Sequence, residues 1–131
     1  MTRRCCVLLA LLAGVVPACD AAATTILDTP TAKLLAPDGA LGDLFGFALA
    51  LDEGAAVIGA FSHSDVPGAM DATGAAYVFD ADSGTLRFEL RPGDLMPGDT
   101  IGLLVGADAG EALVFGGRGA YRFDTATAQE L

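Results

Sequence analysis

The sequence predicts an all-β fold, and three observations support this prediction. Short apolar runs alternate with small residues at a period of two, turns rich in Asp and Gly separate these runs, and part of the chain is repeated. After residue 24, no stretch has the 3.6-residue apolar period of a long amphipathic helix. We therefore expect short antiparallel strands joined by tight turns.

Composition limits the classes of protein to which the chain can belong. Of its 131 residues, 53% are apolar, which excludes an intrinsically disordered chain and is enough for one modest core. The formal net charge is −10, with seven basic residues in all. Nucleic acid is therefore not an expected partner, because phosphate binding needs clustered Lys and Arg.

Residues 1–23 have the pattern of a secretory signal peptide. Arg3 and Arg4 precede an apolar run from Cys5 to Val16, and small residues follow it. A bilayer-spanning helix needs about 20 such residues, so this run is too short to be one. The alternative is a buried N-terminal helix. We expect an exported protein that is periplasmic, on the cell surface or extracellular.

Two cleavage sites compete at the end of this segment. Residues 16–19 resemble the lipobox of bacterial lipoproteins, in which Cys19 would be lipidated and would hold the protein on a membrane. An A-x-A-like site at residues 21–23 would instead release a soluble protein beginning at Thr24. Membrane contact is expected only through the lipid. Either cleavage leaves a mature domain without a disulfide.

An internal repeat organises the rest of the chain. Residues 45–60 align with residues 101–116 at an offset of 56, and residues 76–80 align with residues 120–124 at an offset of 44. The difference is a loop, residues 62–73, that only the first copy has. Four short strands in a unit of roughly 50 residues is the arrangement of a β-propeller blade.

The strands expected in the first copy are separated by turn sequences. Asp52-Glu53-Gly54 is a hairpin turn, and residues 80–84 form a second turn. The expected strands cover residues 45–51, 55–60, 77–79 and 85–90. The whole domain then comprises a partial hairpin at 24–36, repeat one at 37–90 and repeat two at 91–131. This predicts about two blades of four antiparallel strands, an incomplete propeller.

The repeated pieces resemble the FG-GAP repeats of integrin α-chain-type β-propellers, in their compact bacterial form. The matching pieces are residues 42–46, 57–60 and 76–84, and the second copy is degenerate, with Ile101-Gly102 in place of Phe45-Gly46. The resemblance implies an extracellular or surface propeller of about seven blades that binds partners, as in adhesion, and does not catalyse. Integrin-type repeats often carry a calcium loop between their first two strands. Residues 52–54 are too few for the six to eight oxygens that calcium needs.

Two other local patterns have a functional and a structural interpretation. Asp80-x-Asp82-x-Gly84 could begin a metal loop, but Asp and Gly are expected there as turn formers. The glycine-rich residues 116–119 lack the helix that a phosphate loop requires, so we expect a tight turn with Arg118 exposed. No metal and no cofactor is expected.

Two sequence features could suggest an enzyme, but neither supports an enzymatic function. Residues 79–88 resemble the repeats of quinoprotein dehydrogenases, but the docking tryptophan of those repeats is absent. His63 has Ser and Asp close to it in sequence, whereas nucleophilic triads assemble from distant segments. We interpret the loop around His63 as solvated.

The prediction is a non-enzymatic interaction module with an unknown protein or glycan partner. The expected binding residues lie in the unshared loop and are Ser62, His63, Asp65, Met70 and Asp71. Two blades cannot close a ring, so the alternatives are a truncated product, a protomer that closes a propeller as a homo-oligomer, and a structural envelope fragment without a ligand.

Overall fold

The computed structural model describes residues 30, 32–65 and 72–131. The signal-peptide interpretation of residues 1–23, with Cys19, lies outside the described residues, as do Met70 and Asp71. The all-β prediction is confirmed, because the described residues form two antiparallel sheets of four and three strands and no helix. The two sheets do not close into a ring and correspond to incomplete propeller blades. No helix in this part of the chain is long and apolar enough to cross a membrane.

The first sheet is a four-stranded meander in chain order. Its strands are β1 (Ala48–Asp52), β2 (Ala55–Ala60), β3 (Ala75–Asp80) and β4 (Leu86–Leu90). The strand predicted from residue 45 begins three residues later, because Gly46 takes a φ of 89° in a turn that closes with the Phe47 amide on the Leu44 carbonyl. β1 and β2 pair from Asp52 opposite Ala55, as a two-residue hairpin requires.

The second sheet has three strands and the same order. Its strands are β5 (Leu104–Asp108), β6 (Glu111–Phe115) and β7 (Ala120–Asp124). Glu130 forms a single bridge to Phe123 beside β7, on the side where β4 lies in the first sheet. The turn expected at residues 116–119 joins β6 to β7 and is closed by the Gly116 amide on the Gly119 carbonyl.

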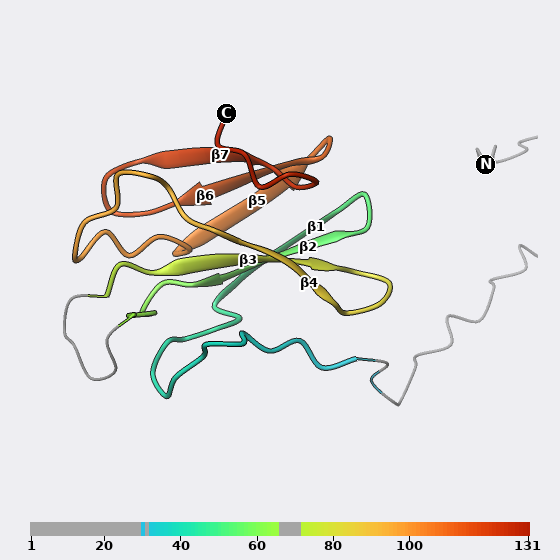
Figure 1. The fold of residues 1–131 in the computed structure, drawn as a ribbon, viewed down its shortest axis with the longest axis horizontal. Helices are drawn as coiled ribbons and strands as arrows, with labels where there is room; N and C mark the ends of the chain where they lie inside the picture. Colours follow the sequence, from blue (N-terminus) through green and yellow to red (C-terminus); the bar gives the residue numbers. More distant parts are fainter. Residues whose placement is uncertain (1–29, 31, 66–71) are drawn as a thin grey trace, which may run out of the picture.

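Residues 32–36 contain no strand, so the described part of the partial hairpin expected at 24–36 is not paired. Leu34 and Ala36 instead pack, with Phe45, on one face of the first sheet. The buried residues beneath them include Ile58, Tyr77 and Phe79. In Figure 1 this segment, in cyan, runs along the face of the first sheet that is turned away from the second sheet. An apolar coil therefore covers the β2 and β3 part of the face on which a preceding sheet would otherwise pack.

Positions 56 residues apart share unusual backbone conformations. The non-glycine residues with positive φ include two such pairs, Leu44 (57°) with Thr100 (50°) and Glu53 (43°) with Ala109 (50°). Three pairs of glycines repeat the pattern, Gly42 with Gly98, Gly46 with Gly102 and Gly54 with Gly110. L-residues rarely adopt positive φ, so the coincidence reflects the same turns built twice.

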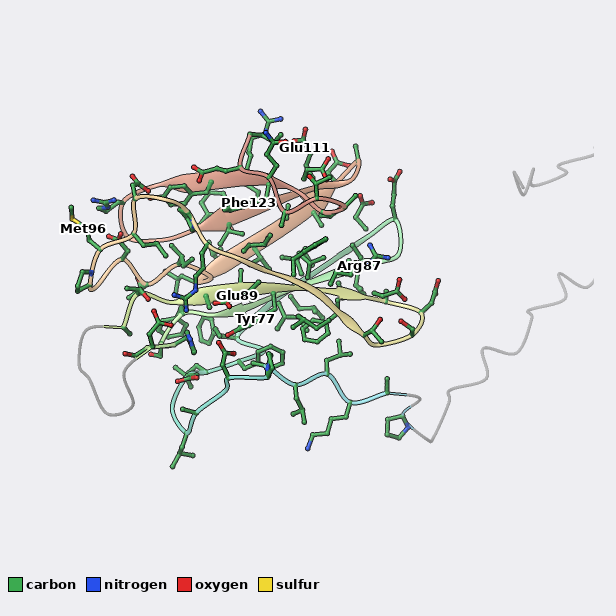
Figure 2. The ribbon with its side chains drawn as sticks, viewed as in Figure 1. Tyr77, Arg87, Glu89, Met96, Glu111 and Phe123 are labelled. Carbon is green, nitrogen blue, oxygen red and sulfur yellow. The ribbon has the colours of Figure 1, made fainter. Side chains whose placement is uncertain are left out.

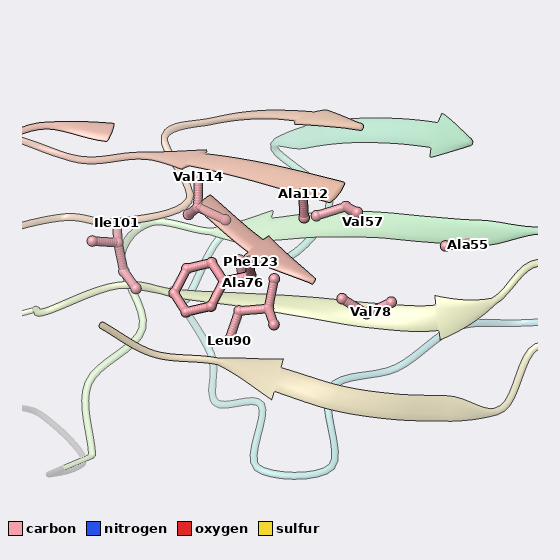
Figure 3. Packing of buried hydrophobic residues seen from close by; sticks show 9 residues of the cluster. All are labelled: Ala55, Val57, Ala76, Val78, Leu90, Ile101, Ala112, Val114 and Phe123. Atoms are coloured by element: carbon pink, nitrogen blue, oxygen red, sulfur yellow. The ribbon is translucent and has the colours of Figure 1, made fainter. Parts of the chain in front are cut away.

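The core lies between the two sheets, as Figure 3 shows. From the first sheet it takes alternate residues of the central strands, together with Leu90 of β4. From the second sheet it takes Ala112, Val114 and Phe123, and Ile101 from the segment before β5. All nine residues of this cluster are at most 2% exposed: Ala55, Val57, Ala76, Val78, Leu90, Ile101, Ala112, Val114 and Phe123. The sheets of the two repeats therefore pack face to face, as neighbouring blades of a propeller do.

The sheets approach most closely at glycines. A Cβ on Gly59 would lie 2.0 Å from the carbonyl oxygen of Gly102, and a Cβ on Gly102 would lie 2.2 Å from the carbonyl oxygen of Ala75. Within each copy the same glycine ties the turn to the second strand: Gly46 donates to the Gly59 carbonyl at 3.0 Å, and Gly102 donates to that of Phe115 at 2.9 Å. Only residues without a side chain allow this approach of backbone to backbone.

Candidate functional site: a buried histidine among carboxylates

His63 is buried, with 2% of its surface exposed, and the expectation that it lies in a solvated loop is wrong. The physical reason is that the loop turns inward directly after β2. The His63 amide donates to the Ala60 carbonyl at 3.0 Å, and the His63 carbonyl accepts from Gly74 at 3.0 Å. The backbone on both sides of the ring is thereby tied to the first sheet. Of the other expected loop residues, Ser62 and Asp65 are described and lie closer to solvent.

Asp43 holds the imidazole from one side. Its carboxylate, 7% exposed as a residue, lies 2.9 Å from Nδ1 of His63 and accepts the Ala40 amide at 2.7 Å. The backbone carbonyl of Asp43 also accepts the Ser62 amide at 3.2 Å. A single buried aspartate therefore closes its own turn and fixes the start of the loop that carries His63.

Three further carboxylates lie at the other side of the ring. Nε2 of His63 lies 3.5 Å from Oδ2 of Asp38 and 3.8 Å from Oδ1 of Asp65. Glu89 of β4 is the third, and one of its carboxylate oxygens lies within 4.8 Å of a ring nitrogen of His63 and of an Asp38 oxygen. Although it is buried, Nε2 has no hydrogen-bond partner within the described residues. Polar groups buried without a partner are uncommon and costly.

The first sheet supplies the floor of this cluster. Tyr77 of β3 is fully buried and donates its hydroxyl to Oδ1 of Asp38 at 2.9 Å. Burial, and then the bond to Asp38, raise the pKa of Tyr77 above its usual range. Glu89 is the cross-strand neighbour of Tyr77, and Figure 2 shows these two side chains next to each other.

Arg91 balances part of this negative charge. Its guanidinium forms two bonds of 2.7 Å to Asp65 and donates from Nε to Glu89. The bond from Arg91 lowers the pKa of Asp65, and the same bond raises the pKa of Arg91 itself. Four carboxylates thus surround His63 and Arg91, so the cluster carries an excess of negative charge.

The second repeat builds the same turn, and its aspartate has a different side-chain partner. Asp99, 4% exposed, accepts the Met96 amide at 2.7 Å, as Asp43 accepts the amide of Ala40. Its partner is Arg118, whose Nε lies 3.0 Å from Oδ1 of Asp99. Arg118 lies on the exposed turn after β6, as expected, and it also pairs with Asp94. In each repeat the buried aspartate therefore has a side-chain partner from the loop after the second strand.

Asp80 and Asp82 lie in the hairpin between β3 and β4, away from this cluster. One oxygen of Asp80 accepts the amides of Asp82 and Ser83 and the Ser83 hydroxyl, and the other oxygen accepts Arg87 at 2.6 Å. Asp124 binds the amides of the following residues in the same way in the second repeat. These are the bonds of turn-forming aspartates.

The outer face of the second sheet holds a shallow depression of about 440 Å³. Arg122 lines it and forms bonds of 2.8 and 2.7 Å to the two oxygens of Glu111, which also lines it. Their counterparts in the first repeat, Val78 and Ala55, lie in the core between the sheets. This salt bridge replaces the apolar contacts that a further sheet would need.

Sequence reasoning missed Asp38, Glu89 and Arg91. They come from the turn after the covering coil, from β4 and from the segment after β4, and no spacing in the sequence joins them to His63. For Asp43 a signal existed, since Gly42-Asp43 recurs as Gly98-Asp99. Only the burial of both aspartates shows what that recurrence means.

Two stacked antiparallel sheets with matched turns define a repeat module of the β-propeller type. Residues 29–79 match the family model described as FG-GAP repeat. The resemblance to FG-GAP repeat proteins is thus confirmed over this segment, which ends within β3. No curated protein and no solved structure matches the chain.

Proposed function

We propose that the protein is an exported, non-enzymatic interaction module that binds another protein through the open side of β1. The observation that carries this proposal is an exposed apolar strip formed by Phe47, Leu49 and Leu51, which are 59%, 59% and 64% exposed. Large apolar side chains exposed together, here on β1 and at the residue before it, are typical of an interaction surface.

The second repeat indicates what kind of surface fits this strip. Val105 and Ala107 of β5, the counterparts of Leu49 and Leu51 at the offset of 56, pack into the core between the sheets. The strip is therefore the position at which one sheet of this fold packs on the next. We infer that the occupant is an apolar β-sheet face of a different protein. A glycan is disfavoured, because the strip offers it no polar side chain.

A second copy of this chain is a poorer occupant. In the stacking seen between the two sheets, it would present the outer face of its second sheet, which carries the Glu111–Arg122 salt bridge. It would also place Phe115 where the first repeat has Gly59, the point of closest approach between the sheets. Closing a propeller with copies of this chain would therefore bury a salt bridge and meet a steric clash.

The first test of the proposal is the molar mass of the protein in solution, and the second is substitution of a strip residue. We expect light scattering to give one protomer, and a Leu49→Glu variant to keep the wild-type melting temperature, because that side chain is exposed. Proteins identified by mass spectrometry should be retained by wild type and by a Leu35→Glu control, which changes an equally exposed leucine on the coil. Loss of the same protein from Leu49→Glu alone supports the strip. Equal retention of a protein by wild type, Leu49→Glu and Leu35→Glu contradicts binding through the strip. A wild-type oligomer that the Leu49→Glu substitution dissociates shows that the strip binds a second copy of this chain, which contradicts a different protein as the partner.

Export and anchoring form a separate part of the proposal, supported by the sequence of residues 1–23. The intact mass of the mature protein tests it. A chain that begins at Cys19 with added acyl mass establishes a lipoprotein, and a chain that begins at Thr24 establishes a soluble exported protein. A mature chain that begins at Met1 would contradict export.

A further inference from the structure

We propose that His63, Asp38 and Glu89 form a binding site for a divalent transition-metal ion of the zinc type. The site goes beyond the proposed interaction function and does not depend on it. It lies where the turn after the covering coil, the loop after β2 and strand β4 meet. It is distinct from the hairpin turn at residues 52–54, where integrin-type repeats often hold calcium.

The spacing of the three donor atoms fits one small ion. One nitrogen of His63 and one carboxylate oxygen each from Asp38 and Glu89 lie within 4.8 Å of one another. An ion at their centre would therefore lie at most about 2.8 Å from each of them, while zinc bonds to nitrogen and oxygen are ~2.0–2.2 Å long. Small rotations of two partly exposed carboxylates close that difference, since the side chains of Asp38 and Glu89 are 41% and 32% exposed.

The histidine is prepared as a ligand. Its side chain is 3% exposed, and Nε2 points toward Asp38 without a hydrogen-bond partner in the described part of the chain. Nδ1 lies 2.9 Å from the buried carboxylate of Asp43. A carboxylate at Nδ1 fixes the tautomer that leaves the lone pair on Nε2, and the same arrangement orients metal-bound histidines generally. The unpartnered nitrogen is thus accounted for by a cation.

The carboxylate ligands are oriented in the same manner. Tyr77 donates to Oδ1 of Asp38, which leaves Oδ2 directed at His63, and Arg91 donates to Glu89. Each of the three ligands therefore has a partner outside the ligand set.

Charge and donor type together define the class of ion. Four carboxylates gather around the imidazole of His63 and the guanidinium of Arg91, so a positive charge is favoured there; they belong to Asp38, Asp43, Asp65 and Glu89. A donor set of one imidazole nitrogen and two carboxylate oxygens suits zinc and its neighbours, whereas calcium and magnesium prefer oxygen alone. Three protein ligands leave a fourth position open to solvent.

The test is calorimetric titration of ZnCl2 into the chelator-treated full-length protein. We expect one ion per chain and a higher melting temperature with zinc, because binding to the folded state stabilises it. Asp38→Asn and Glu89→Gln should each weaken zinc binding at least about tenfold, by analogy with the size of such losses at known sites. Both changes are on partly exposed side chains. Asp82→Asn, an exposed change in the β3–β4 hairpin, is the matched control and should bind as wild type does.

Each other outcome overturns the assignment. Absence of saturable zinc binding contradicts the metal site. Zinc binding that persists unchanged in both Asp38→Asn and Glu89→Gln places the ion elsewhere. Saturable binding of calcium with no binding of zinc contradicts the class of ion. A His63→Gln variant whose circular dichroism matches that of wild type should not bind zinc, and retained zinc binding in this variant contradicts the assignment.

Discussion

Replacing Gly59 by alanine should separate the two sheets. The new Cβ would lie 2.0 Å from the carbonyl oxygen of Gly102 and 2.9 Å from its carbonyl carbon, and both atoms belong to backbone. To restore an ordinary contact of 3.4 Å, one sheet must retreat by about 1.4 Å, which loosens the nine-residue core between them. Overpacking of this kind costs ~1–3 kcal/mol and occasionally more, and we expect about 3 kcal/mol because no flexible side chain can yield.

Urea and thermal denaturation followed by circular dichroism measure this loss. About 3 kcal/mol corresponds to a fall in melting temperature of at least ~12 °C for a domain of this size. The matched control is Gly93→Ala, which adds a Cβ in open space at a residue without positive φ and should change stability by less than about 1 kcal/mol. A Gly59→Ala protein that melts within about 3 °C of wild type would refute the close approach of the sheets.

Three further predictions concern the core, the turns and the buried aspartates. Phe123→Ala should cost ~3–5 kcal/mol in denaturant unfolding, because the ring is 2% exposed between the sheets, and a loss below 1 kcal/mol would contradict that packing. The pKa of Asp80 is held low by Arg87 and Ser83, and that of Asp124 by Thr127, so both stabilise the fold above about pH 4 and lose this effect as pH falls. Melting temperatures of an Asp80→Asn, Asp124→Asn double variant should therefore depend less on pH below 4 than those of wild type. Asp99→Ala should cost about 2 kcal/mol, since it leaves the Met96 amide and Arg118 without their acceptor, and an unchanged urea midpoint would refute this role.

The local structure of this protein could be predicted from its sequence. Alternation of apolar and small residues defined the strands, and Asp52-Glu53-Gly54 defined a hairpin, because both features depend on neighbours in the chain. The offset of 56 likewise follows from the sequence alone. The start of β1 was misjudged by three residues, since the turn at Gly46 is closed by contacts with β2 and with Leu44.

The candidate site could not be predicted in the same way. His63 has polar neighbours in sequence, which favour a solvated loop, yet Asp43 and the first sheet bury it. Asp38 and Glu89 reach it from segments 25 and 26 residues away, and only the packing of the coil on β2 and β3 brings them together.

What the sequence by itself determined is therefore the strands, their turns and their repetition, because hydrophobic period and backbone preference act over a few residues. The tertiary structure alone decided which face of each sheet is buried, where glycine is required and which charges meet. Those properties depend on how one sheet packs on another and on what covers the remaining face. The same repeat position is Gly59 between two sheets and Phe115 on an outer face, and only the stacking explains the difference.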